Sequence, residues 1–131
     1  NYRCGTGHSV SFVGNVHEGP HALNGRNTTL MRPGMIVTDE PGVYETDLVG
    51  IRIENELVCV HKADNQYGTF LGFEPIMFVP IATSPIVPGV LTKDELDWLN
   101  NYHRQVFEKL APRLNDEERD WLAKKCAAIG C

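Results

Sequence analysis

Histidines and glutamates within the first sixty residues are the side chains of this sequence that could carry chemistry. His8 and His17 lie in a glycine-rich opening, where small neighbours let the backbone turn sharply around an imidazole. Glu40 follows an apolar run and precedes Pro41, and Glu54 lies inside an otherwise apolar stretch. One histidine and two glutamates form an oxygen-rich ligand set that suits Mn²⁺, Fe²⁺, Co²⁺ or Zn²⁺. These residues are therefore candidates for a metal site.

Glu54 needs a partner, because burying an uncompensated carboxylate costs several kcal/mol or more. Arg52 lies two residues earlier, on the same face of a predicted strand, and could keep nearby carboxylates ionised or donate to a substrate group. From residue types alone two other interpretations stay open. Each histidine could be a structural residue with satisfied hydrogen bonds, and Arg52 with Glu54 could be the salt-bridged face of a surface strand.

The elements that must position these residues are short β-strands separated by Gly and Pro. Polar stretches at residues 24–29 and 63–69 predict loops, and Pro41 with Gly42 predicts a turn. The predicted strands are residues 10–16, 35–38, 51–60 and 73–80. The third is the clearest, because its apolar residues Ile51, Ile53, Leu57 and Cys59 fall on one face.

Helical periodicity replaces the β pattern after residue 91. Thr92 and Glu95 have the spacing of a capping box, which predicts a helix that runs toward Pro112. A second helix is predicted from Asn115, with acidic residues in its first turn and Gly130 as its stop. The first helix presents an amphipathic face made of Leu96, Leu99, Tyr102, His103, Val106 and Leu110. Strands followed by helices predict an α+β chain.

Composition bounds the class of protein. The 131 residues fit one domain, and 17 acidic against 12 basic residues give a net charge of −5, with no basic run longer than two. These features argue against a nucleic-acid partner, and the longest apolar stretch is too short to span a bilayer. The four cysteines lack the spacing of a structural zinc site, and Cys59 is expected to be a small buried hydrophobe. A cytoplasmic location is the expectation.

An ordered set of motifs resembles one known family. The motifs are Gly5-Thr-Gly-His8, Asn15-Val-His17-Glu-Gly-Pro20, Pro33-Gly-Met-Ile-Val-Thr-Asp-Glu40-Pro-Gly42 and Gly50-Ile-Arg-Ile-Glu54-Asn55. Together they are similar to the C-terminal catalytic half of the Xaa-Pro aminopeptidases, proline-specific metallopeptidases of the pita-bread fold. The resemblance implies that residues 1–90 form the C-terminal half of a pita-bread domain and that residues 91–131 form a helical extension packed on it.

The same resemblance implies a role for each candidate residue. His8, Glu40 and Glu54 would be three of five protein ligands of a dinuclear centre, usually with Mn²⁺, while Zn²⁺ or Co²⁺ would also fit. His17 would act on the substrate side, and Arg52 would belong to the hydrogen-bond network beside the metals. The implied reaction removes an N-terminal residue that precedes proline, by means of a metal-bridged hydroxide.

The resemblance also implies limits and alternatives. The two remaining aspartate ligands would lie upstream of residue 1, so the chain by itself is expected to be inactive. The strands that would normally pair with its own would be absent too, so exposed strand edges and apolar faces predict self-association as a dimer or larger. Cys4 stands where many members carry another histidine, and Ser9 and Ser11 replace glycines of the family pattern. The competing hypotheses are a prolidase, which cleaves Xaa-Pro dipeptides, and a non-catalytic pita-bread interaction module.

Overall fold

The computed structural model describes residues 4–87 and 89–130, and the chain divides into two compact units, residues 1–77 and 78–131. Antiparallel strands precede the helices, which confirms the predicted α+β class; the domain boundary after residue 90 stays a prediction. The first unit contains β1 (Ile36–Asp39), β2 (Gly42–Glu45), β3 (Val49–Arg52), β4 (Asn55–Asn65) and β5 (Gly68–Pro75). The second contains α1 (Lys93–Leu110), the 3-10 turn η1 (Ala111–Arg113) and α2 (Asp116–Lys125).

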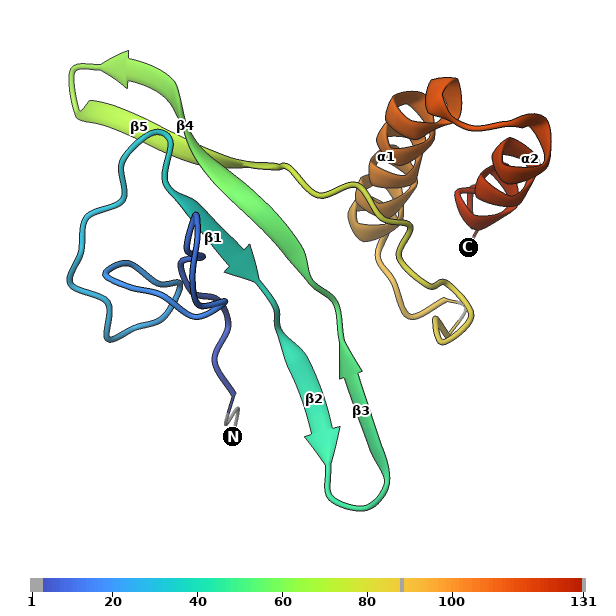
Figure 1. Ribbon diagram of the computed structural model, residues 1–131, viewed down its shortest axis with the longest axis horizontal. Helices are drawn as coiled ribbons and strands as arrows, with labels where there is room; N and C mark the ends of the chain where they lie inside the picture. Colours follow the sequence, from blue (N-terminus) through green and yellow to red (C-terminus); the bar gives the residue numbers. More distant parts are fainter. Residues whose placement is uncertain (1–3, 88, 131) are drawn as a thin grey trace. The chain divides into compact units, whose positions relative to one another are not determined.

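β4 is the central strand of a three-stranded antiparallel sheet with the order β1-β4-β5. Figure 1 shows it as the long ribbon between its two neighbours. Val37 lies opposite Leu57, and Cys59 follows two residues later, so the three side chains share one face of the sheet. Val37 is 0% exposed and Cys59 1% exposed, which confirms that this cysteine is a buried apolar residue.

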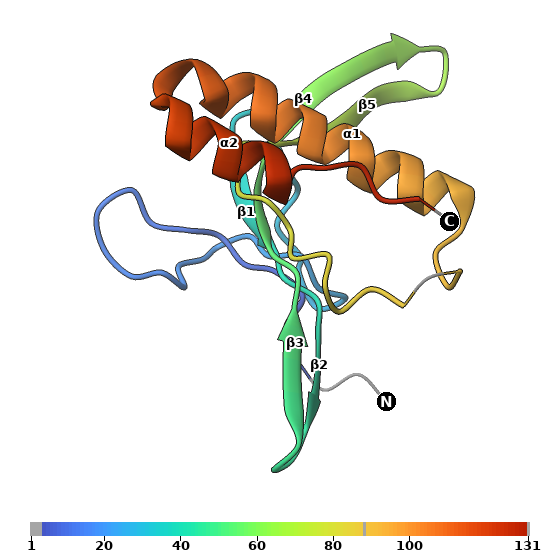
Figure 2. The same cartoon turned by 90° about the vertical axis from the view of Figure 1, so that its right-hand side faces the viewer.

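β2 and β3 form a separate two-stranded hairpin that extends away from the three-stranded sheet (Figure 2). The predicted single strand at residues 51–60 is therefore wrong, because the structure divides it at Ile53 and Glu54 into β3 and β4. The predicted turn at Pro41 and Gly42 is also wrong, since Gly42 begins β2. The break has a physical cause: Ile53 N–H donates to the Pro41 carbonyl at 3.3 Å, but proline has no N–H to return.

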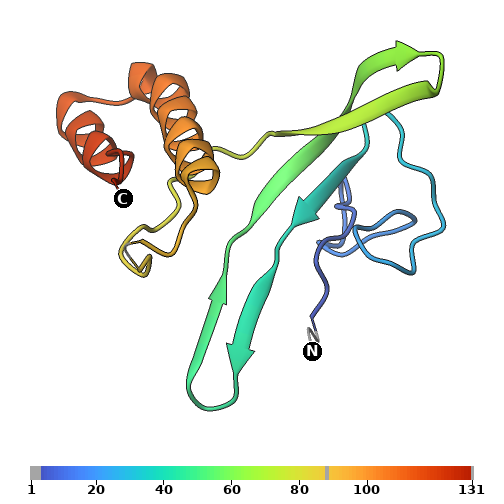
Figure 3. The same cartoon turned by 180° about the vertical axis from the view of Figure 1, so that it is seen from behind.

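The segment before β1 folds as loops that lie along the edge of β1, as Figures 1 and 3 both show. Isolated bridges join Ser9 to Val37 and His8 to Ala22. The predicted strand at residues 10–16 is wrong, because the chain turns back on itself there and Ser11 N–H donates to the Asn15 carbonyl. Its large apolar side chains find no sheet to pack on, and Phe12 is fully exposed.

The β4–β5 hairpin corrects two further boundaries. Its strands pair as far as Asn65 and Gly68, so the loop predicted at residues 63–69 shrinks to a two-residue turn. β5 ends at Pro75, and the second half of the strand predicted at residues 73–80 is irregular. The Asp64 carboxylate accepts bonds from Thr69 and His61 beside this turn, which lowers its pKa and stabilises the tight connection.

The second unit is a helical hairpin whose two helix starts agree with the sequence prediction. Thr92 and Glu95 form the capping box of α1, and Asn115 with Glu118 forms that of α2. The core consists of Tyr102, Val106 and Leu122, with partly buried side chains packed around them. Among the described residues no helix has the length and apolar character needed to cross a membrane.

His103 is completely buried in the second unit, on the inner face of α1. Its Nε2 accepts a hydrogen bond from the Ile81 N–H at 3.0 Å, which requires the imidazole to be neutral with the proton on Nδ1. Burial lowers the pKa of His103 because it disfavours the charged ring. The neighbouring Tyr102 hydroxyl donates to the Val79 carbonyl at 2.9 Å, so two consecutive side chains hold the extended segment before α1.

Candidate metal centre

His8 is fixed by backbone pairing between its segment and β1. The Thr38 N–H donates to the His8 carbonyl at 2.9 Å, and the His8 N–H donates to the Thr38 hydroxyl at 3.0 Å. Gly7 permits this approach, because a Cβ at that position would lie 1.9 Å from the Thr38 carbonyl oxygen. The glycine of the Gly5-Thr-Gly-His8 motif is therefore required by close packing of two backbones.

The Ser9 carbonyl determines which ring nitrogen of His8 is available. It lies 2.9 Å from His8 Nδ1, and a carbonyl only accepts hydrogen bonds, so Nδ1 carries the proton. The neutral ring then has its lone pair on Nε2, which is the arrangement of a histidine that binds a metal. The same carbonyl also accepts the Glu18 N–H at 3.0 Å, which ties the loop that carries His17 back to His8.

Glu40 faces the free nitrogen of His8. Its Oε1 lies 3.0 Å from His8 Nε2, and the Thr38 hydroxyl is 3.3 Å from the same oxygen. The Glu40 side chain is 13% exposed and that of His8 16% exposed. Two lone-pair atoms at this distance repel each other unless a proton or a metal cation lies between them. The contact therefore needs a proton or a metal cation between the two side chains.

Glu54 lies across from Glu40 at the break in the β-ribbon. Asp39 pairs with Asn55 on one side of the break, and Gly42 pairs with Arg52 on the other, with the same register. Glu40 and Glu54 are therefore directly opposite positions with side chains on the same face. Directly opposed carboxylates repel, which favours a shared cation at this point.

Arg52 supplies that cation in the structure. Its Nη1 lies 3.3 Å from Glu40 Oε2, and its Nε lies 3.4 Å from Glu54 Oε2. The expectation that Glu54 has a charged partner is thus confirmed. Arg52 is half exposed, so the pair is compatible with a surface salt bridge as well as with the network beside a metal site.

His17 lies beside His8 and Glu40, although the two histidines are nine positions apart in the sequence. Their ring centroids are 4.0 Å apart, and one ligand atom from each of the three side chains lies within 4.8 Å of the others. His17 is exposed, whereas His8 and Glu40 are partly buried. Glu54 is not a member of this cluster among the residues that the structure describes.

An open cavity of about 600 Å³ gives access to the site, a volume within the usual range of small-ligand sites. Thr38 and Tyr44 also shape the site, and the residue patterns of the sequence did not predict them. Thr38 binds both His8 and Glu40, and its position two residues before Glu40 on one strand face was the available signal. The cavity is lined by Cys4, Gly5, Gly7, His8, His17, Ala22, Asn24, Glu40, Tyr44 and Arg52.

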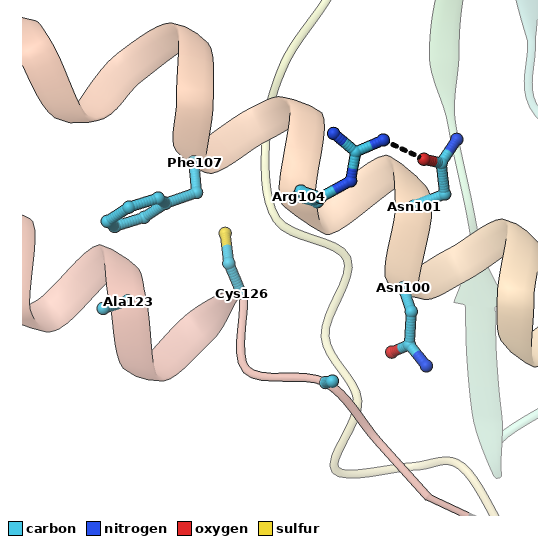
Figure 4. Close-up of a pocket in the computed structure, with 7 residues that line it drawn as sticks. Asn100, Asn101, Arg104, Phe107, Ala123 and Cys126 are labelled. Carbon is cyan, nitrogen blue, oxygen red and sulfur yellow. Dashed lines mark hydrogen bonds between the residues drawn. The ribbon is translucent and has the colours of Figure 1, made fainter.

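A second open cavity, of about 550 Å³, lies between α1 and α2 (Figure 4). Phe107, Ala123 and Cys126 line its apolar side, and burial raises the pKa of the Cys126 thiol. Asn100 exchanges two hydrogen bonds with the backbone of Ile129, which holds the C-terminal segment against α1. No cluster of metal ligands lies here among the residues that the structure describes.

The donor set of the first cavity fits a divalent metal. A lone pair on His8 Nε2, a carboxylate on Glu40 and a neighbouring His17 imidazole are the ligand types of Zn²⁺, Co²⁺, Fe²⁺ and Mn²⁺. The bond from His8 Nδ1 to a backbone carbonyl is the outer contact that such ligands ordinarily make. With a metal present, the arrangement has the elements of a hydrolytic site.

Comparisons with known proteins agree with this chemistry. The sequence profile of metallopeptidase family M24 matches residues 1–61, and that of the C-terminal region of peptidase M24 matches residues 69–129. The chain therefore belongs to metallopeptidase family M24. The first region contains β1, β2, β3 and most of β4, and the second contains most of β5 and both helices.

Relatives of this chain are named as aminopeptidases. Aminopeptidase P2 of Arabidopsis thaliana is 47% identical over 92% of this chain and 18% of its own length. A probable Xaa-Pro aminopeptidase P of Coprinopsis cinerea is 41% identical over 98% of this chain and 22% of its own. This chain thus spans about a fifth of the length of these relatives.

The solved structure of the X-prolyl aminopeptidase from Caenorhabditis elegans has the same fold over this region. The TM-score is 0.81 at 39% identity, and the match covers 95% of this chain and 21% of the other. That protein is described as a cytosolic enzyme with a di-nuclear active site. The match supports the resemblance to a C-terminal part of the pita-bread fold.

Proposed function

We propose that this chain forms the C-terminal part of the catalytic domain of an Xaa-Pro aminopeptidase, which removes an N-terminal residue that precedes proline. The observation that carries the proposal is the contact of His8 Nε2 with Glu40 Oε1 at 3.0 Å, with His8 Nδ1 committed to a backbone carbonyl. This geometry presents two metal donors at the wall of an open cavity. The names of the Coprinopsis cinerea relative and of the Caenorhabditis elegans enzyme state the specificity for proline.

The residues of the chain have distinct tasks in this proposal. His8, Glu40 and Glu54 hold divalent ions, with Mn²⁺ as the metal that the resemblance implies and Zn²⁺ or Co²⁺ as alternatives. Bound metal supplies an acidified water and a Lewis acid for the scissile carbonyl. Arg52 orients both carboxylates through its two contacts, and His17 lies on the open side of the cavity, where a substrate carbonyl would approach.

A cleavage assay tests the proposal in a chain extended upstream to the length of the relatives. Release of arginine from Arg-Pro-Pro is expected, whereas cleavage of Gly-Pro alone would instead indicate a prolidase. Glu54→Gln is expected to reduce the rate by at least about 100-fold, because it removes a metal donor. His61→Gln is the matched control, since His61 is an exposed histidine that contacts Asp64 at the far end of β4. Equal loss in both variants, or no cleavage by the unmodified enzyme, would refute the assignment.

The 131 residues by themselves are expected to be inactive, because they carry three of the five ligands that the resemblance implies. Arg-Pro-Pro cleavage by the purified chain would contradict this.

We also infer that the protein is located in the cytoplasm and that the chain self-associates. Val43 and Ile51 face each other on the β2–β3 hairpin and are 63% and 50% exposed, which favours burial against another surface. A monomer mass by light scattering at micromolar concentration would exclude self-association.

A further inference from the structure

We propose that β5 is the surface through which this chain self-associates, by antiparallel pairing with β5 of a second copy. The proposal rests on the self-association inferred above and adds the strand, the register and the residues that meet. β5 forms one edge of the three-stranded sheet (Figure 1), and no strand pairs with its outer side in the part of the chain that the structure describes. An unpaired edge of this kind is a template for another strand.

The opposite edge of the same sheet is covered by the chain itself. Thr38 N–H donates to the His8 carbonyl, and Glu40 N–H donates to the Thr6 carbonyl, so the N-terminal segment pairs along β1. Among the described residues β5 has no comparable cover. It is therefore the edge of this sheet at which further pairing can occur.

A hydrogen bond at the end of β5 shows which backbone groups point outward. Ile76 N–H donates to the Glu56 carbonyl at 2.8 Å, so Ile76 faces β4. The register is regular from Pro75 back to residue 71, and backbone direction alternates along an antiparallel strand. Gly72 therefore also faces β4, whereas Leu71 and Phe73 present their N–H and C=O groups to the open edge.

The side chains of Leu71 and Phe73 make this edge apolar. Phe73 lies opposite the buried Cys59, and Leu71 is two positions along on the same face of the sheet. Leu71 is 38% exposed and Phe73 40% exposed, so the apolar face continues to the edge without being covered there. On the other face, Glu74 is paired with Lys62 at 2.7 Å, so β5 presents no unpaired charge that would repel a second strand.

The residues around Gly72 make the edge complementary to itself. Leu71 and Phe73 flank this glycine. When two β5 strands run antiparallel with their Gly72 residues facing each other, Leu71 of each copy lies opposite Phe73 of the other. Both residues point outward, so each pair exchanges its backbone hydrogen bonds, and the two side chains meet on one face. A register shifted by one position would place outward residues opposite inward ones and remove these bonds.

The symmetry of this pairing determines the size of the assembly. The same strand contributes to both sides of the contact, so the arrangement has a two-fold axis and closes with two copies. A proline-containing peptide is a poorer occupant of the edge, because proline lacks the N–H that an added strand donates. The competing surface for self-association is the β2–β3 hairpin, where Val43 and Ile51 are exposed, and the experiment must separate the two surfaces.

The first test is amide hydrogen exchange in the purified 131-residue chain, at concentrations below and above the dimer midpoint measured by light scattering. The Leu71 and Phe73 amides are expected to exchange at least about tenfold more slowly in the dimer, because pairing occupies them. The Gly72 amide faces β4 and reports on folding. Its protection is expected to be the same at both concentrations.

Leu71→Pro tests the edge by mutation. It removes an outward N–H and keeps the bonds to β4, a position at which an edge strand tolerates proline. The dissociation constant of the dimer is expected to rise at least about tenfold, because the symmetric contact loses this hydrogen bond twice. Val43→Asp on the β2–β3 hairpin is the control and is expected to leave the dissociation constant unchanged. Far-UV circular dichroism checks that both variants are folded.

A disulfide crosslink tests the register in a chain whose Cys4, Cys126 and Cys131 are replaced by serine. Gly72→Cys places two thiols across the two-fold axis, where facing residues that exchange no hydrogen bonds have Cα atoms about 4.5 Å apart, within disulfide range. Oxidation is expected to give covalent dimers. Leu71→Cys is the matched control, because its two copies lie diagonally, about 7–8 Å apart, and are too distant for a disulfide.

Several results would overturn the proposal. They are a monomer at all concentrations, exchange of the Leu71 and Phe73 amides that does not depend on concentration, and a dimer that Val43→Asp disrupts and Leu71→Pro does not. Crosslinking through Leu71→Cys in place of Gly72→Cys would also contradict it. Arg-Pro-Pro cleavage by the extended enzyme decides the proposed peptidase function separately, because none of these measurements depends on activity.

Discussion

Gly7→Ala should separate the N-terminal segment from β1 and disrupt the candidate metal centre, which lies where the two meet. The added Cβ would lie 1.9 Å from the Thr38 carbonyl oxygen, whereas real contacts of this kind are at least 3.0 Å, so the two backbones must separate by about 1.1 Å. That movement stretches three hydrogen bonds that are now 2.7–3.0 Å long: Thr38 N–H to the His8 carbonyl, His8 N–H to the Thr38 hydroxyl, and Glu40 N–H to the Thr6 carbonyl. At about 1 kcal/mol each, their loss lowers the free energy of unfolding by about 2–4 kcal/mol once strain is included.

Gly5→Ala is the matched control, because nothing lies within 4 Å of a Cβ built at that position. Urea unfolding measures the stability difference between the two variants, and hydrogen exchange of the Thr38 and Glu40 amides localises it. Gly7→Ala is also expected to weaken Zn²⁺ binding, since His8 moves away from Glu40. Equal unfolding free energies for the two variants, with both amides still protected, would refute the close-packing argument.

Three further substitutions test other contacts. Arg52→Met leaves the facing carboxylates of Glu40 and Glu54 without their shared cation, so the free energy of unfolding should fall by about 1 kcal/mol or less. Added Zn²⁺ should reduce the difference in melting temperature between the variant and the unmodified chain. A gain in stability would contradict this prediction. Burial lowers the pKa of His103 below its ordinary 6.5, so as the pH falls the imidazole is protonated in the unfolded chain before it is protonated in the folded chain. The free energy of unfolding should therefore fall as the pH drops from about 6.5 toward the lower pKa of the folded state. Urea unfolding at several pH values would show that slope, and His103→Asn should lack this component. Tyr102→Phe removes two bonds to the backbone of Val79 and should cost about 1–2 kcal/mol by the same assay, a loss that an unchanged midpoint would exclude.

Local interactions explain which elements the sequence could predict. The helix starts at Thr92 and Asn115 depend on hydrogen bonds to residues three positions along, so the residue types alone specify them. The segment at residues 10–16 has the composition of a strand, yet it forms none, because a strand also needs a partner with a free edge. Pairing of that kind depends on contacts distant in sequence, which residue patterns do not contain.

The candidate metal centre could likewise be predicted only in part. The residue types of His8, Glu40 and Glu54 indicated metal chemistry, but the contact of His8 with Glu40 depends on hydrogen bonds between His8 and Thr38, which lie thirty positions apart in the sequence. No periodicity encodes that juxtaposition, and only the resemblance to a family brought the motifs together in advance. The closeness of His17 could not be predicted either, since a loop closed through the Ser9 carbonyl produces it.

Pro41 explains why two carboxylates come to face each other at this point. The pair of Pro41 and Ile53 makes one of the two hydrogen bonds of a regular antiparallel pair, because proline has no N–H to donate. The ribbon therefore opens beside Glu40 and Glu54, while the unchanged register keeps them opposite each other. A regular ladder would fix both backbones rigidly, whereas the missing bond leaves room for the carboxylates to adjust around a cation. The Glu-Pro sequence thus supplies the proposed metal donor Glu40 and, in the next residue, the local freedom that this donor would need.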